Sequence, residues 1–178
     1  MNKRKLEYLA AILVPILILS FMTIKPLLTI YAGKTILLET KPVDPTDLFR
    51  GDYVNLSYEA EEIPVSLVKE DVLKREREGD GKFTVYVVLK EKNGVHQPVS
   101  VTLHRPKETI YLKGRLSYVS GSESSQESAF IQYSLDRYFL QENTGRELEQ
   151  ASLKGSLIAE VKVRKGYAIL RDIRIGTR

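Results

Sequence analysis

Apolar residues run without a charge from Tyr8 to Ile24, and this stretch predicts a membrane-spanning helix near the start of the chain. Its 17 residues make about 25 Å of helix, whereas a bilayer core of roughly 30 Å needs about 20 residues. Lys25 can extend its ammonium group to the interface, and the residues after it add a last turn or two. Tyr8 and Tyr31 then lie where interfacial aromatic residues are favoured. We therefore expect residues 8–31 to contact a lipid bilayer.

Charges on either side of this segment predict its orientation. Lys3, Arg4 and Lys5 precede it, and a basic leader favours a cytoplasmic N-terminus. A cleaved signal peptide is less compatible, because Ile30 would occupy the −3 position of the best cleavage site. A buried core helix would be expected to have a polar face. We expect residues 1–33 to form a leader and anchor in the cell membrane, and residues 34–178 to form an extracytoplasmic β-rich domain.

Alternation of apolar and polar residues predicts strands along the rest of the chain. In the segment Gly51–Tyr58 the even positions Val54, Leu56 and Tyr58 are expected to face the core, because successive side chains of a strand point to opposite faces. Strands are also predicted over Thr35–Thr40, Lys82–Lys90, Val95–His104, Thr109–Val119, Ala129–Leu140, Gly155–Arg164 and Tyr167–Ile175.

Turn and helix signals connect these strands. Asn93-Gly94 and Lys165-Gly166 predict tight hairpin turns, and Pro98 predicts an edge strand or a bulge. Ser66–Glu78 predicts a helix capped by Ser66 and ended by Gly79. A second short helix is predicted over Thr144–Leu153, and Ser120–Ser128 predicts a flexible loop.

These elements predict a β-dominated α+β domain, an antiparallel sheet structure with one or two short helices. A partly closed barrel and two packed sheets would both satisfy the pattern. The sequence has no cysteine, which excludes disulfides, thiolate metal sites and cysteine nucleophiles.

The basic composition of the chain comes mostly from the anchor region. The formal net charge is +4, of which +3 lies in the first 25 residues, where Lys3, Arg4, Lys5 and Lys25 outnumber Glu7. Nucleic-acid binding needs a basic stripe on the folded domain, so we do not expect a nucleic acid partner.

Several residues are candidates for function, each with a structural alternative. For Asp52 three alternatives remain: a buried acid with a shifted pKa, a turn residue that accepts backbone N–H bonds, or a buried ion pair with an arginine such as Arg50 or Arg137. The aromatic residues near it either line a groove for a peptide or a glycan or pack in the core; they are Phe49, Tyr53, Tyr58 and Tyr138. Arg50, Arg146 and Glu149 are candidates for contact with a protein partner.

Catalytic and metal sites are not predicted. The acidic residues Asp44, Asp47, Asp52 and Glu59 lack the spacing of a calcium loop. The two histidines, His96 and His104, are about 27 Å apart on a single extended strand, too far for one metal. We expect no catalytic residue, no metal and no cofactor.

The string Gly51-Asp52-Tyr53-x-x-Leu56-x-Tyr58 resembles the signature of the GDYXXLXY family of bacterial membrane-bound proteins. The segments around Asp44–Arg50, Tyr86–Leu89, Tyr138–Phe139 and Gly145–Glu149 are also similar to that family. The resemblance implies no assigned activity, substrate or cofactor. Family members often resemble companions of polytopic membrane proteins, which implies an accessory role.

A fainter resemblance is to type I signal peptidases, carried by Pro45-Thr46-x-Leu48-x-x-Gly51-Asp52. The nucleophilic serine of those enzymes would fall at Pro42, which has no hydroxyl, so a Ser–Lys dyad cannot form there. The sequence therefore favours a membrane-anchored accessory or interaction protein of a cell-envelope membrane complex. The alternatives are a catalytically inactive peptidase relative and a domain that binds an envelope polymer or peptide.

Overall fold

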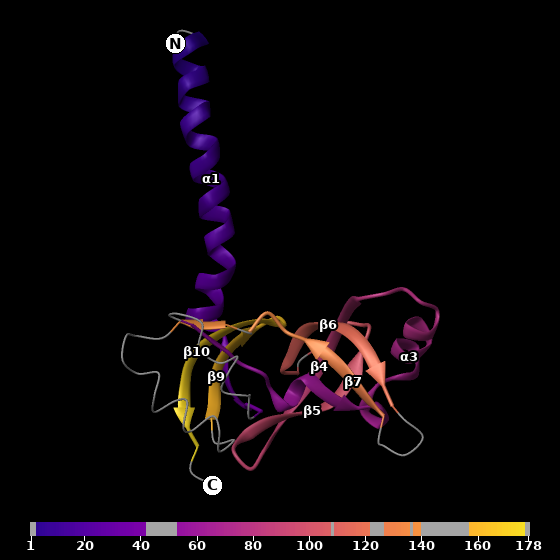
Figure 1. The fold of residues 1–178 in the computed structure, drawn as a ribbon. Helices are drawn as coiled ribbons and strands as arrows, with labels where there is room; N and C mark the ends of the chain where they lie inside the picture. The colour runs from indigo at the N-terminus through magenta and orange to yellow at the C-terminus, as the bar shows by residue number, and fades with distance from the viewer. Residues whose placement is uncertain are drawn as a thin grey trace.

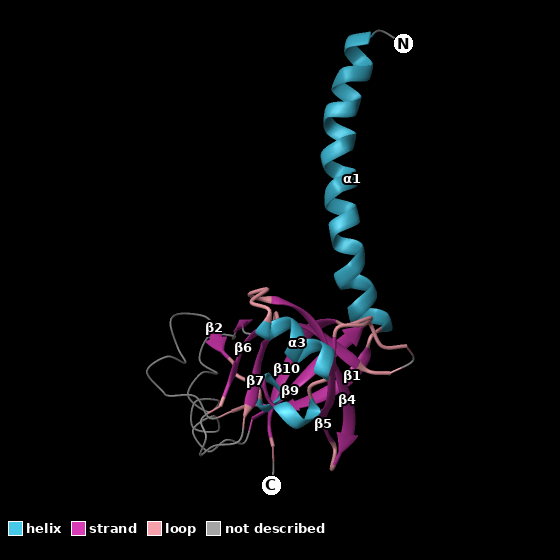
Figure 2. Ribbon diagram, turned by 90° about the vertical axis from the view of Figure 1, so that its right-hand side faces the viewer, coloured by secondary structure: helices cyan, strands magenta, loops and turns pink. Residues whose placement is uncertain are grey.

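The computed structural model describes residues 3–41, 53–107, 109–121, 127–135, 137–139 and 157–176, with the backbone alone at 3–7, 9–10, 53–55 and 137–139. One long helix projects from a β-rich part (Figure 1 and Figure 2). The predicted helix over Thr144–Leu153 and most of the Ser120–Ser128 loop lie outside the described residues.

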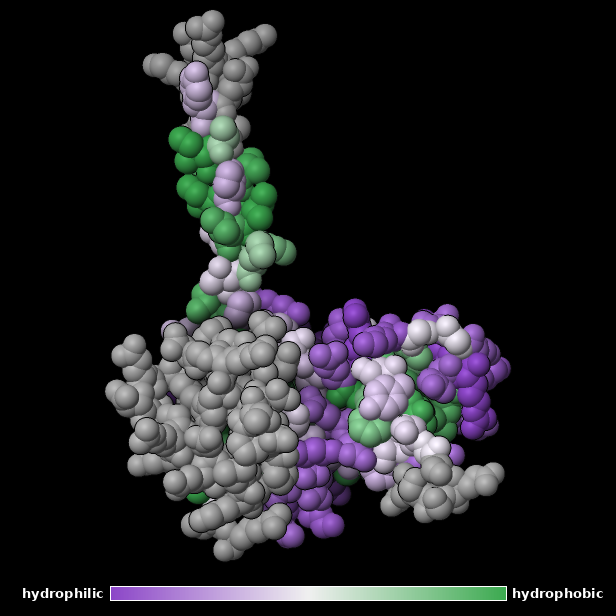
Figure 3. Space-filling model, in the orientation of Figure 1, coloured by the Kyte–Doolittle hydropathy of each residue, from purple (hydrophilic) through white to green (hydrophobic). Residues whose placement is uncertain are grey.

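The long helix α1 runs from Lys3 to Ala32 and continues through Pro15 and Pro26. Its segment Ala11–Ala32 is long and apolar enough to cross a membrane, and none of its most apolar stretch is buried in the protein. Four consecutive residues, Ile16 to Leu19, are each more than half exposed. Four residues span more than one turn, so apolar side chains are exposed all round this section of the helix. Figure 3 shows the face turned to the viewer, on which green, hydrophobic residues predominate. A helix that is apolar on every side needs an apolar environment.

The β-rich part consists of antiparallel sheets that do not close into a barrel. The smaller sheet has the order β1-β9-β10, and the larger has the order β3-β7-β6-β4-β5. Strands β2 and β8 form a separate pair. The strands are β1 (Lys34–Glu39), β2 (Tyr53–Asn55), β3 (Glu62–Pro64), β4 (Phe83–Lys92), β5 (Val95–Thr102), β6 (Tyr111–Ser120), β7 (Ser128–Gln132), β8 (Arg137–Phe139), β9 (Leu157–Arg164) and β10 (Tyr167–Ile175). The prediction of antiparallel sheets is confirmed, with separate sheets rather than a barrel.

The core lies between the smaller sheet, β1-β9-β10, and the larger sheet, β3-β7-β6-β4-β5. Alternate residues of β4 are buried, from Phe83 to Leu89, as the period of two predicts. They pack in one cluster with Ile36 and Leu38 of β1 and with Val161 of β9. At the edge of the larger sheet, the Leu37 N–H donates to Nδ1 of the buried His96 at 3.4 Å. This bond joins β1 to β5.

Both predicted hairpin turns are confirmed. Asn93 and Gly94 have φ of 54° and 81°, the positive values that a tight two-residue hairpin requires. Lys165 and Gly166 repeat the arrangement, with φ of 53° and 80°. Pro98 lies on the edge strand β5, next to a register shift at which Val99 of β5 has no partner in β4. Both features fit a proline, which lacks the N–H that a central strand would use.

Three sequence predictions are corrected by tertiary contacts. The helix predicted from Ser66 begins later: residues Val65–Leu67 form the 3₁₀ turn η2, and helix α3 runs only from Glu70 to Arg77. The segment between them is held by β5, since the Lys69 N–H donates to the Val101 carbonyl at 3.0 Å. The strand predicted over Ala129–Leu140 is interrupted by a turn between β7 and β8. Within the described part of the motif segment, only the three residues of β2 are strand.

Helix α1 is connected to strand β1 of the smaller sheet without a flexible linker. A single residue, Gly33, separates the end of α1 from the start of β1. Its N–H donates to the Thr29 carbonyl at 2.9 Å, and a Cβ at Gly33 would collide with the same oxygen. Thr29 is buried, and the Lys25 ammonium lies 4.2 Å from the centre of the Tyr167 ring on β10. These contacts hold the helix in a set direction relative to the smaller sheet.

Candidate functional site

Two motif residues are buried in the core. Leu56 is 3% exposed and Tyr58 is fully buried, as the alternation of the motif segment predicts. Tyr58 immediately precedes the 3₁₀ turn η1 (Glu59–Glu61), and its N–H donates to the Glu61 carboxylate at 3.1 Å. The Tyr58 hydroxyl donates to the Leu135 carbonyl at 2.8 Å. Tyr58 therefore packs and hydrogen-bonds inside the fold.

A second buried tyrosine lies beside this contact. Tyr133 is 2% exposed, and its hydroxyl donates to the Ala60 carbonyl at 2.8 Å. Burial, with a smaller contribution from the charge of Glu61, raises the pKa of the Tyr133 phenol far above its ordinary value. The neutral phenol is the form that can donate, so the environment favours this hydrogen bond.

The remaining candidate residues are placed only in part. Strand pairing sets Val54 opposite Tyr138 and Tyr53 opposite Phe139, so the motif strand and the segment around Tyr138 are neighbours. The other candidates lie outside the described residues: Phe49, Arg50, Gly51, Asp52, Arg146 and Glu149. The alternatives given for Asp52 therefore stay predictions. No group of three or more described His, Asp or Glu side chains could hold a metal ion.

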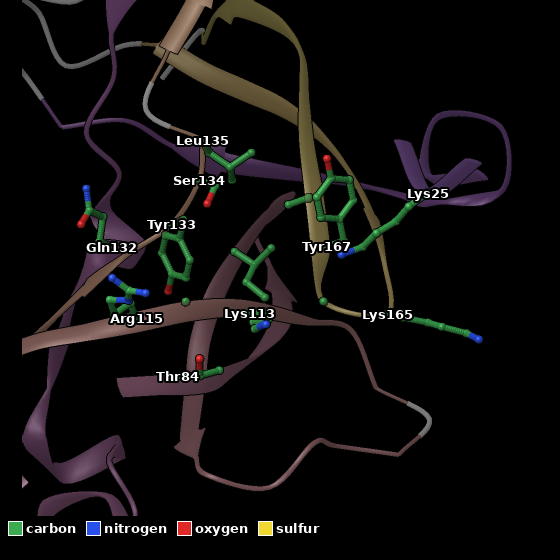
Figure 4. A pocket seen from close by; sticks show the side chains of 14 residues that line it. Lys25, Thr84, Lys113, Arg115, Gln132, Tyr133, Ser134, Leu135, Lys165 and Tyr167 are labelled. Carbon is green, nitrogen blue, oxygen red and sulfur yellow. The ribbon is translucent and has the colours of Figure 1, made fainter. Parts of the chain in front are cut away.

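The larger of two cavities among the described residues lies where α1 meets the two sheets. This cavity of about 560 Å³ is lined by Lys25 of α1, by Lys113 and Arg115 of β6, and by the β9–β10 turn at Gly166. The turn reaches this point because β9 is antiparallel to β1, with Val163 opposite Lys34. The Lys113 N–H then donates to the Gly166 carbonyl at 2.9 Å, which joins the turn to the larger sheet. Figure 4 shows Lys25 extending towards Tyr167, with Lys113 and Arg115 across the opening.

A smaller cavity of about 250 Å³ shares Lys165 and Gly166 with the larger one and is also lined by Lys34 and Arg164. The six cations around the two cavities form what we call the basic collar: Lys25, Lys34, Lys113, Arg115, Arg164 and Lys165. Among the described residues of the two linings there is no Asp or Glu. Among the ion pairs of the described residues, none involves a collar residue.

Sequence reasoning did not find this collar. Lys113 and Arg115 are two residues apart on β6, so they share one face of the strand, and this spacing was a detectable signal. The other members come from α1, β1 and the β9–β10 turn. Their convergence depends on the pairing of β1 with β9 and on the contact of Gly166 with β6.

The fold therefore defines a β-rich protein whose N-terminal apolar helix is joined by one residue to the first strand of the smaller sheet. A basic site lies at this junction. The chain belongs to the GDYXXLXY protein family, whose model matches residues 15–173. No curated protein matches the chain, and no solved structure matches it. The fainter resemblance to type I signal peptidases thus finds no support.

Proposed function

We propose that this protein is a membrane-anchored accessory protein, whose extracytoplasmic domain holds a binding surface at a set height and direction for a membrane protein partner. In this proposal α1 spans the cell membrane with its N-terminus in the cytoplasm, and residues 34–178 form the exported domain. Residues 1–33 form the leader and anchor.

The linker-free junction is the observation that carries the proposal. A domain that only needed to be retained at the membrane would be served by a flexible tether. Here one residue connects α1 to β1, the Gly33 N–H bonds back to Thr29, and Lys25 lies over the Tyr167 ring. Such a junction restricts rotation of the domain about the helix. Restricted orientation lowers the entropic cost of binding a neighbour in the same membrane.

We place the proposed binding surface at the paired strands β2 and β8. They bring Tyr53 of the motif next to Phe139 and Val54 next to Tyr138. We propose that this pair of strands, with Phe49, Arg50, Arg146 and Glu149 from the adjoining segments, contributes the partner contacts. Aromatic and arginine side chains are enriched among residues that dominate binding energy at protein interfaces.

The test is crosslinking in intact native cells, followed by detergent purification of the full-length protein and mass spectrometry. We expect one membrane protein to be recovered reproducibly in constant proportion. Tyr53→Ala and Tyr138→Ala should reduce its recovery, whereas Tyr118→Ala on β6 should not, although Tyr118 is 53% exposed. Recovery of the protein alone from intact cells would overturn the proposal.

A second variant tests the junction itself. Six Gly/Ser residues inserted between Ala32 and Gly33 should leave the protein in the membrane but reduce recovery of the partner. The matched control carries the same insertion in the exposed turn between Asn93 and Gly94. Equal partner recovery with both insertions would show that a set orientation is not needed.

A further inference from the structure

The basic collar lies close to the point where the apolar part of α1 ends. The charge-free stretch stops at Ile24, and α1 continues from Lys25 to Ala32. That last section is about 12 Å long, enough to add one further turn within the bilayer core and to cross most of a headgroup layer of roughly 5–8 Å. If α1 spans the membrane as proposed above, the Lys25 ammonium and the larger cavity lie at the depth of the lipid phosphates.

The lining of the larger cavity suits a phosphate group. Lys25, Lys113 and Arg115 supply positive charge from two elements, and arginine can donate two parallel hydrogen bonds to phosphate oxygens. Thr84, Gln132 and Ser134 add neutral polar groups to the same lining. Figure 4 shows Lys165 extending from the turn towards the outside, where it can meet a second anion.

Among the described ion pairs none includes a residue of the basic collar. This argues against a purely structural role for the collar cations. Arg174, by contrast, is paired with Glu160 and Asp172, and Arg75 with Asp80. Four cations line the larger cavity, Lys25, Lys113, Arg115 and Lys165. Without a described acidic partner they repel one another. An anion bound between them would remove that repulsion.

We propose that the basic collar binds the phosphate group of an anionic phospholipid, with the cavity between Lys25, Lys113 and Arg115 as the main site. The occupant is assigned to the bilayer rather than to solution because the cavity adjoins the apolar helix. A bound headgroup would further hold the domain against the membrane surface. This inference rests on the membrane anchoring in the proposed function and adds a ligand to it.

The experiment uses the full-length protein in neutral detergent. Short-chain phosphatidylglycerol, phosphatidylcholine and inorganic phosphate are titrated separately, and bound ligand is counted by native mass spectrometry. We expect phosphatidylglycerol to bind in preference to phosphatidylcholine, with an affinity that falls as salt is raised. The double variant Lys113→Gln, Arg115→Gln should weaken phosphatidylglycerol binding on the order of tenfold or more.

The matched control is the double variant Arg77→Gln, Lys90→Gln. It removes the same two charges from exposed positions that line neither of the two cavities, and it should bind phosphatidylglycerol as the unmodified protein does. Equal binding by the collar variant and the control would overturn the proposal. Inorganic phosphate that binds as tightly as phosphatidylglycerol and displaces it would also overturn the lipid assignment, in favour of a soluble phosphate compound.

Failure of this inference is distinguishable from failure of the proposed function. A collar variant that loses lipid but still recovers the crosslinked partner separates the two roles. Unchanged lipid binding with normal partner recovery would remove only the lipid inference. Lipid selectivity without any recovered partner would remove only the accessory function.

Discussion

Tyr58 and Tyr133 each donate a hydrogen bond to the backbone of the segment that carries the other tyrosine. Each hydroxyl donates to the backbone carbonyl two residues beyond the other tyrosine: Tyr58 to Leu135, and Tyr133 to Ala60, both at 2.8 Å. Both side chains are buried. The pair, here called the tyrosine clasp, holds the turn after β7 against the 3₁₀ turn η1. The last tyrosine of the family motif is thus buried and hydrogen-bonded within the fold.

Removing either hydroxyl of the clasp should destabilise the fold. Tyr58→Phe and Tyr133→Phe each leave a carbonyl without its donor, so each should lower the free energy of unfolding by about 1–3 kcal/mol. Chemical denaturation of the full-length protein in detergent, followed by circular dichroism, measures the change. The control Tyr118→Phe alters an exposed ring and should change stability by less than about 0.5 kcal/mol. Losses no larger than that of the control would contradict the structural role.

The raised pKa of Tyr133 predicts alkaline instability. An unfolded tyrosine ionises near 10.0, whereas burial keeps the folded Tyr133 phenol protonated well above that pH. Above about pH 10 the folded state therefore binds one proton more than the unfolded state. The contribution is complete below the unfolded pKa, and stability then falls by about 1.4 kcal/mol per pH unit as pH rises further.

Tyr133→Phe provides the test of this pH dependence. It should be less stable than the unmodified protein at pH 8, but its stability should fall less steeply above about pH 10. Denaturation midpoints measured at steps between those conditions give both slopes. Parallel slopes for the two proteins would mean that Tyr133 ionises in the folded state as readily as in the unfolded state.

The two hairpin glycines form a matched pair for testing the packing of the Gly166 turn. Gly94 and Gly166 have φ of 81° and 80°, so Gly→Ala introduces the same backbone strain of about 1–2 kcal/mol at each. Around Gly94 an added Cβ meets nothing within 4 Å, whereas at Gly166 it would lie 2.5 Å from Cε2 of Tyr111. Gly166→Ala should therefore cost about 1–3 kcal/mol more than Gly94→Ala. Thermal denaturation compares them, and equal losses would contradict the close approach to Tyr111.

The proposed orientation can be tested by single-cysteine labelling, because the chain has no cysteine of its own. Lys92→Cys places a thiol at an exposed position at the end of β4. It should react with a membrane-impermeant maleimide in intact spheroplasts. Asn2→Cys should react only after the membrane is permeabilised. The reverse pattern would place the β-rich domain in the cytoplasm.

The predictions from sequence that succeeded concern local patterns. The alternation from Phe83 to Leu89 identified the buried face of β4, and the two Xaa-Gly turns identified both hairpins. The helix predicted from Ser66 began too early, because hydrogen bonding of Lys69 to Val101 of β5 competes with helix formation. The predicted strand after Ala129 was too long, because the turn at Leu135 accepts its hydrogen bond from Tyr58. Neither partner is near in the sequence.

By itself the sequence determined the apolar helix, the strand periodicity, the turns and the family, because each depends on residues close together in the chain. Tertiary structure alone decided that the sheets stay separate, that the Tyr58 hydroxyl donates to the Leu135 carbonyl and that the Tyr133 hydroxyl donates to the Ala60 carbonyl. It also decided that cations from α1, β1, β6 and the β9–β10 turn surround one junction. These features arise from pairing between distant segments, and a one-dimensional pattern does not specify which segments pair.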